Sequence, residues 1–597
     1  MNTPSFDDTQ SSGQDNEDNV LIEESTGEDV NTSQHRKEYP QRERTRPKYL
    51  DDYITDIEQE ENSNYVHTCT LLDSVDCCYK VCGLPQDYNE ALNSREAPDW
   101  EQAMTDELNS LKQNDAFDLV KLPEGKNVVG GRWVYAIKEN AEGSTSFKAR
   151  YVAKGYSQKK GIDYQETFSP TADITSVRAF MQVAVQNNLI VHQMDVKTAY
   201  LHAPIDSEIY LQQPEGFEVK SDSGEKLVYK LKKSIYGLKQ SGRNWNKLLH
   251  DHLSNNDFVQ NSADYCVYKK TTPNGVIIVV IWVDDMIIAA SNMTLLDKFK
   301  ETMREQFNMK DLGQISYFLG INFTQTSDEI KMSQKRYITK MLEKFGMTDC
   351  KPRSSPCESK PDDNPQNDEP TDPRKFREVV GSLIYAATST RPDISWSVSR
   401  LSQHLSDPKK KHMIMAKQVL RYLKGTIDNE LVYKKSDKPL ELFAFSDSDW
   451  ASCVEDRKST TGYCFSLTED GAVFSWKSKK QPTVALSTCE AEYMALGATT
   501  QESLYLSQLL KDMDPKNTYK CVKIYEDNQG AIALCKNPVN RQRSKHIDIK
   551  YHFVRSVLEE GRIKVVYCPT ENMAADILTK PASKLKIQKF KRYLFGN

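Results

Sequence analysis

Three aspartates have the types and positions that a divalent-metal site requires. Asp284 and Asp285 stand side by side in the stretch "IWVDDMIIAA", which is otherwise almost wholly apolar, and Asp195 follows the apolar run "LIVHQM". A buried carboxylate pair is costly unless cations or hydrogen bonds compensate it, and gathered carboxylates need a divalent metal to offset their repulsion. The simpler interpretation of a lone "DD" pair is two surface aspartates in a turn.

Strands are needed to position these aspartates. Asn274-Gly275 is a strong signal for a hairpin turn, and apolar strands are predicted over residues 276–283 and 286–290. The two adjacent aspartates then occupy a tight turn at the edge of the core. The run before Asp195 predicts a further strand, and two strand ends can bring Asp195 beside the acidic pair.

A second group of acids lies in the C-terminal part of the chain. Asp447 follows "LELFAF", Asp527 follows "VKIY", and Asp576 lies on a helix predicted after "RIKVVYC". This layout gathers carboxylates at one edge of a sheet. On the helix predicted before Asp527, Glu490 and Glu492 cannot both face one site, because positions two apart diverge by about 200°. The alternative interpretation is helix caps and solvated acids.

The composition is that of a globular protein with an acidic tail. The 597 residues are 38% hydrophobic and 27% charged, without an apolar run long enough for a membrane helix or a signal peptide. Residues 1–65 carry a charge of −11, which leaves +5 of the total of −6 for the remainder. A mildly basic body is compatible with nucleic acid. The thirteen cysteines are irregularly spaced, which disfavours a zinc site.

Several motifs in one order resemble those of a known family. The stretches "FKARYVAKGYSQ", "QMDVKTAYLH", "KSIYGLKQSGRNWN" and "IWVDDMIIA" are followed by "MKDLGQISYFLGINF", "VGSLIYAATSTRPDIS" and "VLRYLKGT". From about residue 98 to the C-terminus the chain closely resembles the reverse transcriptases of copia-type LTR retrotransposons. It departs from the usual family pattern at Trp282, where Tyr is common, and at Ser241-Gly242, where Ala-Pro is common.

The resemblance implies roles for residues around the polymerase site. Asp195 and Asp284 would be the main metal ligands, with Asp285 assisting. The other residues with implied roles are the triphosphate contacts Lys148 and Arg150, the nucleotide- and template-positioning Gln240, the sugar-contacting Tyr200, and the supporting Arg243, which Trp245 follows in the same motif. An aromatic wall at Tyr200 would leave no room for a 2′-hydroxyl, whereas its plain alternative is core packing.

The second acid set resembles the catalytic site of a ribonuclease H. The "AEY" context selects Glu492 over Glu490, and Asp447, Glu492, Asp527 and Asp576 would bind metal and catalyse hydrolysis. The stretch "SKHIDIKYHFVR" is typical of the same family. His546 and Asp548 within it support the site or, alternatively, begin an amphipathic helix with a structural histidine.

The implied fold class is α+β, with a right-hand polymerase followed by a connecting region and an RNase H-like domain built on a mixed sheet. We predict a disordered acidic linker over 1–97, fingers, palm and thumb over 98–350, and a Pro/Asp-rich linker over 351–375. A helical connection region is predicted over 376–436 and the RNase H-like domain over 437–597. From about residue 440 the expected order is three strands, a helix, a strand, a helix, a strand and a helix.

The implied function is an RNA-directed DNA polymerase, also DNA-directed, with RNase H activity and two Mg²⁺ ions per site, for which Mn²⁺ is a substitute. Its partners would be an RNA template, a DNA primer, RNA–DNA hybrid and dNTPs. Capsid and integrase of the same element would act in trans or in one polyprotein, of which this chain would be the terminal part unless it is a truncated gene. No membrane partner is expected, and the location would be intracellular and cytoplasmic, compatible with virus-like particles and nuclear entry.

Two other function classes stay open. The chain could be an inactive or domesticated remnant that binds nucleic acid without catalysis, but both acid sets are complete. It could also be a host DNA-repair enzyme, which the order of the motifs disfavours.

Overall fold

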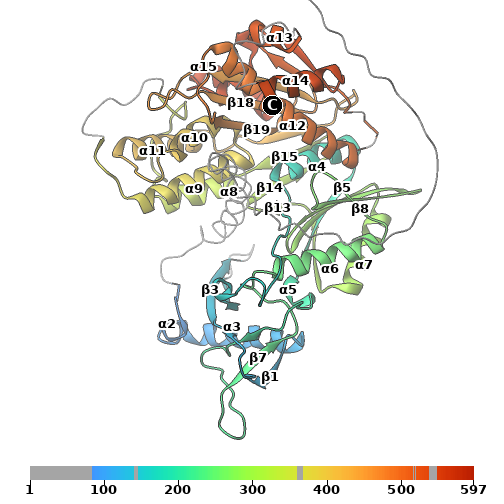
Figure 1. Cartoon of the computed structure of the whole chain (residues 1–597), viewed down its shortest axis with the longest axis vertical. Coiled ribbons are helices and arrows are strands. Elements are labelled where there is room, and N and C mark those ends of the chain that lie inside the picture. The colour runs from blue at the N-terminus through green and yellow to red at the C-terminus, as the bar shows by residue number, and fades with distance from the viewer. Residues whose placement is uncertain are drawn as a thin grey trace, which may run out of the picture. The chain divides into compact units, whose positions relative to one another are not determined.

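A computed structural model describes residues 84–139, 145–358, 368–514, 516–517, 519–536 and 548–596 (Figure 1). All of these residues lie within the unit Cys69–Asn597. None of the helices in the described ranges is both long and apolar enough to cross a membrane.

Ordered structure begins earlier than predicted. Helix α2 (Tyr88–Leu92) lies inside the range 1–97 that was predicted to be a disordered linker, and its Ala91 is buried in a core cluster, so that part of the prediction is wrong. Helix α3 (Ala97–Gln113) follows, with Pro98 in its first turn. Proline is favoured there because its missing N–H needs no partner. Asp99 also lies within this first turn.

Two small sheets surround helix α3. Strands β3 and β4 form an antiparallel hairpin, and α3 packs on it through Trp100, which contacts Tyr135 and Phe147 edge to face. A separate sheet has the order β1-β7-β6-β2. The elements of this region are β1 (Phe117–Lys121), β2 (Val128–Val129), β3 (Gly131–Glu139), β4 (Thr145–Ala153), η2 (Gly155–Ser157), β6 (Tyr210–Leu211) and β7 (Leu227–Leu231).

A six-stranded sheet of order β12-β5-β11-β10-β9-β8, the central sheet, carries the predicted hairpin. Strand β10 is apolar throughout because both of its faces are buried. Ile278 and Val280 belong to one core cluster, while Ile277 and Val279 on the opposite face belong to another. The elements are α4 (Ile174–Gln186), β5 (Ile190–Val196), α5 (Ala199–His202), α6 (Ser241–Asn255), β8 (Val259–Gln260), β9 (Val267–Thr272), β10 (Gly275–Trp282), β11 (Asp285–Ala290), α7 (Met293–Gln306) and β12 (Met309–Gln314).

Helix α7 covers the central sheet with one apolar face. It buries Leu295, Leu296, Phe299 and Met303, and it packs against β10 and β11 (Figure 1). Its start is fixed by Asn292, whose side chain accepts a hydrogen bond from the backbone N–H of Leu295.

The region after the central sheet mixes strands with helices. Its four-stranded sheet has the order β13-β14-β15-β16, so the segment predicted as helical over 376–436 ends in a strand, β16, that pairs with β15. Propensity alone did not reveal β16 because its partner lies about a hundred residues earlier. The elements are β13 (Tyr317–Phe318), β14 (Ile321–Gln325), β15 (Glu329–Ser333), α8 (Lys335–Lys344), α9 (Pro373–Ser389), η4 (Pro392–Ile394), α10 (Ser395–Ser402), α11 (Lys410–Gly425) and β16 (Leu431–Lys434).

The last sheet, called the C-terminal sheet, has the order β19-β18-β17-β20-β21. Strands β17, β18 and β19 are antiparallel, whereas β20 and β21 add parallel strands, which confirms the predicted mixed sheet. The predicted element order is confirmed except that two helices separate β20 from β21. The elements are β17 (Phe443–Asp449), β18 (Thr460–Ser466), β19 (Val473–Lys480), α12 (Thr488–Met513), β20 (Val522–Glu526), α13 (Gln529–Lys536), α14 (Asp548–Glu559), β21 (Ile563–Tyr567), η5 (Thr570–Asn572), η6 (Ala574–Leu578) and α15 (Lys584–Phe595).

Candidate functional sites

The first candidate site lies at the turn between β10 and β11. Val283 and Asp284 form a two-residue connection, and Asp285 is the first residue of β11. In the antiparallel pair of β11 with β5, Asp285 lies directly opposite Asp195. Directly opposed residues point to the same face of a sheet, so these two carboxylates share one face. The backbone N–H of Val196 donates to the carbonyl of Asp284 over 2.8 Å, which ties the turn to β5.

The turn is held in an unusual conformation. Val283 has a φ of 55°, a left-handed conformation that β-branched residues rarely adopt. The indole N–H of the buried Trp245 on α6 donates to the carbonyl of Val283 over 2.7 Å. Such a conformation persists only when its surroundings fix it, so Trp245 determines where the neighbouring Asp284 lies.

The charge around Asp195 is not purely negative. Lys310 on β12 lies opposite Asp195 on the other side of β5, and cross-strand pairs of opposite charge are favourable. Within the described ranges, the polymerase acids do not form a group of three with ligand oxygens mutually within 4.8 Å. All three are half-buried at one sheet edge, and oxygen-only donors there suit a hard divalent cation.

Three aromatic and basic side chains, Arg150, Tyr200 and Tyr236, lie beside this turn and are called the wall. Arg150 on β4 lies over the ring of Tyr236, with 4.4 Å from its guanidinium carbon to the ring centroid, and Tyr200 meets the same ring edge to face at 4.7 Å. Burial raises the pKa of Tyr236 to about 12. Arg150 opposes that rise, while the charges of Asp284 and, more weakly, Asp195 add to it. Tyr236 therefore links Arg150 and Tyr200 to the acids.

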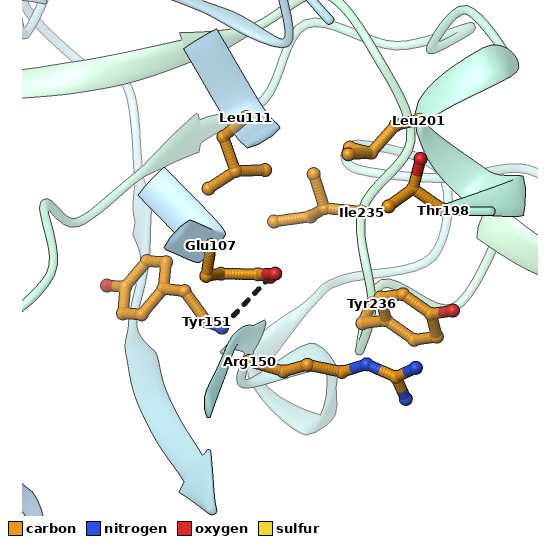
Figure 2. Close-up of a pocket in the computed structure, with 8 residues that line it drawn as sticks. All are labelled: Glu107, Leu111, Arg150, Tyr151, Thr198, Leu201, Ile235 and Tyr236. Carbon is orange, nitrogen blue, oxygen red and sulfur yellow. Dashed lines mark hydrogen bonds between the residues drawn. The ribbon is translucent and has the colours of Figure 1, made fainter. Parts of the chain in front are cut away.

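A cavity of about 40 Å³ opens next to this wall (Figure 2). It is lined by Arg150, Tyr236 and Thr198 among others, and Glu107 accepts a hydrogen bond there from the backbone N–H of Tyr151. This volume suits one or two water molecules and is far too small for a nucleotide. A nucleotide would therefore lie against the wall and not inside the cavity.

One glycine decides where Tyr236 lies. Gly237 has a φ of +93°, and a Cβ there would come within 2.1 Å of the carbonyl oxygen of Ala153. The backbone N–H of Ala153 donates to the carbonyl of Tyr236 over 2.9 Å. Only glycine permits this approach, which brings the "YGLK" turn onto the end of β4, the strand of Arg150.

The other predicted polymerase residues are more widely placed. Lys148 is exposed on β4 two residues before Arg150, so both project from the same face. Gln240 is fully buried, and its amide donates to the carbonyl of Asp163 and accepts from Gln158. In this conformation its side chain is a packing group and not part of an open surface. Arg243 forms a 2.5 Å ion pair with Glu166.

Both departures from the family pattern are accommodated by packing. The hydroxyl of Ser241 donates to the carbonyl of Ile235 over 2.6 Å, which fixes the turn that Ala-Pro would stiffen. Trp282 is 7% exposed and belongs to the core cluster on one face of the central sheet. Neither Ser241 nor Trp282 stands in the place of one of the three predicted metal ligands.

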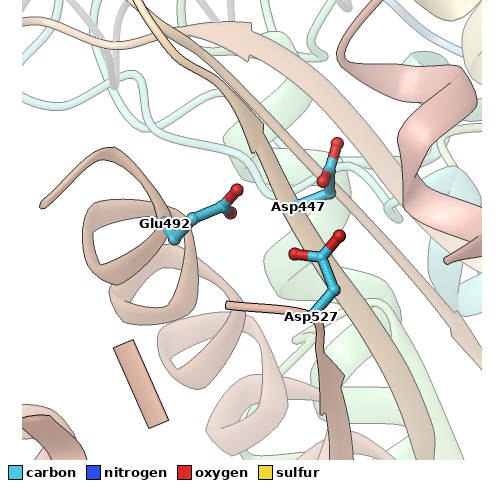
Figure 3. Close-up of side chains that lie close together, drawn as sticks. All are labelled: Asp447, Glu492 and Asp527. Atoms are coloured by element: carbon cyan, nitrogen blue, oxygen red, sulfur yellow. The ribbon is translucent and has the colours of Figure 1, made fainter. Parts of the chain in front are cut away.

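The second candidate site is a carboxylate cluster on the C-terminal sheet. Asp447 on β17, Glu492 on α12 and Asp527 after β20 bring one oxygen each within 4.8 Å of one another, and Figure 3 shows the carboxylates pointing toward a common centre. Glu490 is not part of this cluster. Its carboxylate accepts from the backbone N–H of Leu486, next to the N-cap of α12.

The electrostatics of this cluster favour a cation. Burial, followed by the charges of Asp447 and Glu526, raises the pKa of Glu492, and burial also raises the pKa of Asp447. One oxygen of the buried Glu492 lacks a hydrogen-bond partner in the described part of the chain. Three convergent carboxylates with an unsatisfied oxygen fit a divalent ion that takes oxygen ligands.

Asp576 lies on η6, a short 3₁₀ helix, and is fully buried. Its carboxylate contacts the ammonium groups of Lys580 and Lys586 and is not grouped with the three clustered acids. The buried hydroxyl of Thr579 connects the two places, because it donates to the carboxylate of Asp447 and also to the carbonyl of Asp576. His546 lies outside the described residues, and the side chain of Asp548 is likewise not described, although α14 begins there.

Sequence reasoning missed four residues beside the two sites. Tyr236 and Lys310 lie within motifs that were quoted for the family resemblance, and Thr579, three residues after Asp576, has no signal of its own. Glu526 is fully buried next to Asp527, and burial raises its pKa well above the usual range. An acid as the last residue of an alternating strand was the available signal for it.

The comparisons with known proteins extend over most of the chain. Residues 114–359 match the family model described as reverse transcriptase (RNA-dependent DNA polymerase). The chain is 39% identical over 516 residues to the retrovirus-related Pol polyprotein from transposon TNT 1-94 of Nicotiana tabacum, covering 84% of this chain and 38% of that polyprotein. It is also 39% identical, over 82% of its length, to the polyprotein from transposon RE1 of Arabidopsis thaliana, of which it spans 33%.

A shorter relative is covered completely. The chain is 33% identical over 312 residues to a putative transposon Ty5-1 protein of Saccharomyces cerevisiae, which corresponds to 52% of this chain and 100% of that protein. Among solved structures, the foamy viral protease-reverse transcriptase in complex with dsDNA is similar at 14% identity, with a TM-score of 0.43 over 79% of this chain and 83% of that chain.

Proposed function

Because the chain belongs to the reverse transcriptase family of copia-type retrotransposon Pol proteins, we propose that it is an RNA-directed DNA polymerase with ribonuclease H activity. It would copy RNA, and then DNA, from a primed template and hydrolyse the RNA of the resulting hybrid. One observation carries the proposal: carboxylates gather at the edges of two separate sheets, at the turn after β10 and at the end of β17.

The polymerase step would be an attack of the primer 3′-oxygen on the α-phosphorus of a dNTP, which forms a phosphodiester bond and releases diphosphate. Asp195 and Asp284, assisted by Asp285, would hold divalent ions that activate the hydroxyl and neutralise the leaving diphosphate. Lys148 and Arg150 project from one face of β4, where two cations suit a triphosphate.

Discrimination between sugars would depend on Tyr200. Its ring packs edge to face on Tyr236, so it cannot swing away from the sugar without losing that contact. We expect Tyr200→Ala to admit ribonucleotides, measured as the ratio of kcat/KM for dNTP and rNTP. An unchanged ratio would mean that Tyr200 is only a packing residue and does not select the sugar.

The hydrolytic step would be an attack of water on an RNA phosphodiester. Asp447, Glu492 and Asp527 converge from three elements and would hold the ions that activate the water, with Asp576 as the fourth acid. Carboxylates at the ends of strands and on a helix are held rigidly, which keeps the geometry of the site fixed between turnovers.

The substrate would be bound mainly through its phosphates. The predicted partners are therefore an RNA template, a DNA primer, the RNA–DNA hybrid and dNTPs, and binding should weaken steeply with salt. Mg²⁺ is the proposed ion, with Mn²⁺ as a substitute. The chain spans about two fifths or less of the plant polyproteins that it matches, so capsid and integrase remain proposed partners.

The alternative, a remnant that binds nucleic acid without catalysis, is separated from the proposal by one experiment. The full chain is incubated with a labelled DNA primer on an RNA template, dNTPs and Mg²⁺. We expect extension that Asp284→Asn abolishes and that Asp297→Asn, an exposed acid on α7, leaves unchanged. Binding of the primer–template without extension would favour the remnant.

Hydrolysis is tested separately with a labelled RNA strand in an RNA–DNA hybrid. Asp447→Asn should abolish cleavage while primer extension continues. Asp437→Asn changes an exposed acid shortly before β17 and serves as the control. Cleavage that persists in Asp447→Asn would show that the cluster on the C-terminal sheet is not the hydrolytic site.

A further inference from the structure

Two lysines contact Asp576, the fourth acid of the proposed ribonuclease H site on the C-terminal sheet, which is called the C-terminal site. Lys580 follows Asp576 by four residues, and Lys586 comes from the first turns of α15; both ammonium groups contact the carboxylate of Asp576. Asp576 is fully buried, whereas the lysine side chains are only 35% and 30% exposed. A buried carboxylate is tolerated when cations lie beside it, so these contacts compensate its charge.

The same lysines also act on two of the three clustered acids. The charges of Lys580 and Lys586 oppose the rise in the pKa of Asp447, and Lys580 does the same for Glu492. Thr579, next to Lys580, donates its hydroxyl to Asp447. Two positive charges therefore contact Asp576 and also act on Asp447 in the neighbouring cluster.

We propose that Lys580 and Lys586 are internal counter-ions of this acid site. The two lysines stay paired with Asp576 until a divalent cation displaces them. This inference rests on the proposed ribonuclease H site. A cation that enters must break the lysine contacts before Asp576 becomes a ligand, and it meets the repulsion of two ammonium groups. The lysines thus lower the affinity of the site for metal and set the concentration at which it is filled.

The geometry favours this role over a contact with substrate phosphate. An ammonium group that serves a phosphate would point to solvent, but both groups here touch a carboxylate that solvent does not reach. Burial also lowers the pKa of Lys586, an effect that the nearby Asp447 opposes. Both observations indicate lysines that interact with acids of their own chain and not with a substrate phosphate.

The test measures metal binding and not activity. Binding of Mn²⁺ to the full chain is followed by the loss of the free-ion EPR signal, and titration of Asp447→Asn gives the contribution of all other sites. We expect Lys586→Met and Lys580→Met each to lower the dissociation constant of the C-terminal site about three- to tenfold. Lys584→Met removes the same charge from an exposed position on α15 and should change it less than about twofold.

One further variant, together with the second Met variant, keeps the test decisive. Lys586→Arg retains the charge and should bind Mn²⁺ as the wild type does. Lys580 is the more exposed of the two, so Lys580→Met gives a result if Lys586→Met does not fold. Unchanged or weaker binding in the Met variants, or an equal change in Lys584→Met, would overturn the proposal.

A substrate role gives a different pattern from a metal role. If the lysines hold phosphates, the Met variants would lose affinity for the RNA–DNA hybrid and keep wild-type Mn²⁺ binding, which also overturns the proposal. Failure of the proposed function is distinct from both results, because a chain that never cleaves hybrid can still show the shift in Mn²⁺ affinity.

Discussion

Arg150 lies over the ring of Tyr236, with 4.4 Å from its guanidinium carbon to the ring centroid. The two residues come from separate segments that meet because Gly237 allows the "YGLK" turn to touch Ala153. A guanidinium over an aromatic ring loses much of its freedom to move, so Arg150 would be held in place for the triphosphate of the proposed polymerase reaction.

Replacing Tyr236 should weaken nucleotide binding. Tyr236→Leu removes the ring under Arg150, and we expect KM for dNTP to rise about three- to tenfold with a smaller change in kcat. Steady-state primer extension at varied dNTP provides the measurement. Tyr236→Phe keeps the ring and should restore KM. An equal loss in the Phe variant would mean that the hydroxyl, and not the ring, is the important group.

Trp245 should act on catalysis through the turn that carries Asp284. Trp245→Phe keeps the packing but loses the indole hydrogen bond to the carbonyl of Val283. We expect the single-turnover rate of nucleotide addition to fall about tenfold while KM for dNTP stays constant, because misplacement affects the reaction more than binding. Trp450→Phe, just after β17, removes an indole hydrogen bond to the carbonyl of Ala485; it is the matched control and should leave this rate unchanged.

Thr579 should orient Asp447 for hydrolysis. Thr579→Val has nearly the same shape without the hydroxyl, and we expect hybrid cleavage to fall about tenfold or more, as for other groups that orient metal ligands. Thr579→Ser restores the donor and should recover most of the rate. Cleavage that falls equally in the Ser and Val variants would point to packing of the methyl group as the cause.

The buried ion pair of Arg391 and Asp393 should be important for stability. Both side chains are fully buried, and Tyr422 also donates to Asp393. Asp393→Asn leaves the charge of Arg391 without its partner and should destabilise the fold by about 3 kcal/mol. Glu378→Gln breaks an exposed pair with Arg374 and should cost less than about 1 kcal/mol. Urea unfolding followed by tryptophan fluorescence compares the two variants.

The stacked histidines His404 and His412 should make stability fall in weak acid. Burial, with the charges of His404 and Lys411, lowers the pKa of His412 from 6.5 to about 4. The unfolded chain takes up this proton at a higher pH than the folded chain does. The contribution is therefore complete above pH 6.5 and is lost as the pH falls toward about 4.

Replacing His412 tests the predicted fall in stability with falling pH. The melting temperature of His412→Gln should fall less than that of the wild type between pH 7 and pH 4. His552→Gln changes an exposed histidine and should follow the wild type. A wild type that becomes more stable as the pH falls through this range would contradict the prediction.

The sequence could predict the hairpin because its signals are local. The Asn-Gly pair and two apolar runs define two strands and the turn that holds Asp284, and burial of both faces of β10 explains why the first run has no polar position. The hairpin turn at the Asn-Gly end lies one residue earlier than expected, over Pro273 and Asn274, with Gly275 opening β10. Helix α7 was predictable for the same reason, since its apolar face repeats along one stretch.

Other features depend on segments far apart in the chain. Strand β16 exists because β15 offers it a partner, and the order of the C-terminal acids could not show that Asp576 contacts two lysines. Tyr236 had no signal because its importance arises from a backbone contact with β4. The start of order before residue 98 was missed because helix α2 is short and is stabilised by packing on distant residues.

By itself, the sequence determined which acids follow predicted strands and in what order they occur along the chain, because residue type, strand patterns and motif order can be read from it. Only the tertiary structure decided that Asp285 faces Asp195, that Trp245 fixes the turn, and that Lys580 and Lys586 lie on Asp576. The physical reason is that strand register and side-chain burial are set by long-range packing, and these contacts determine the charge that each acid carries.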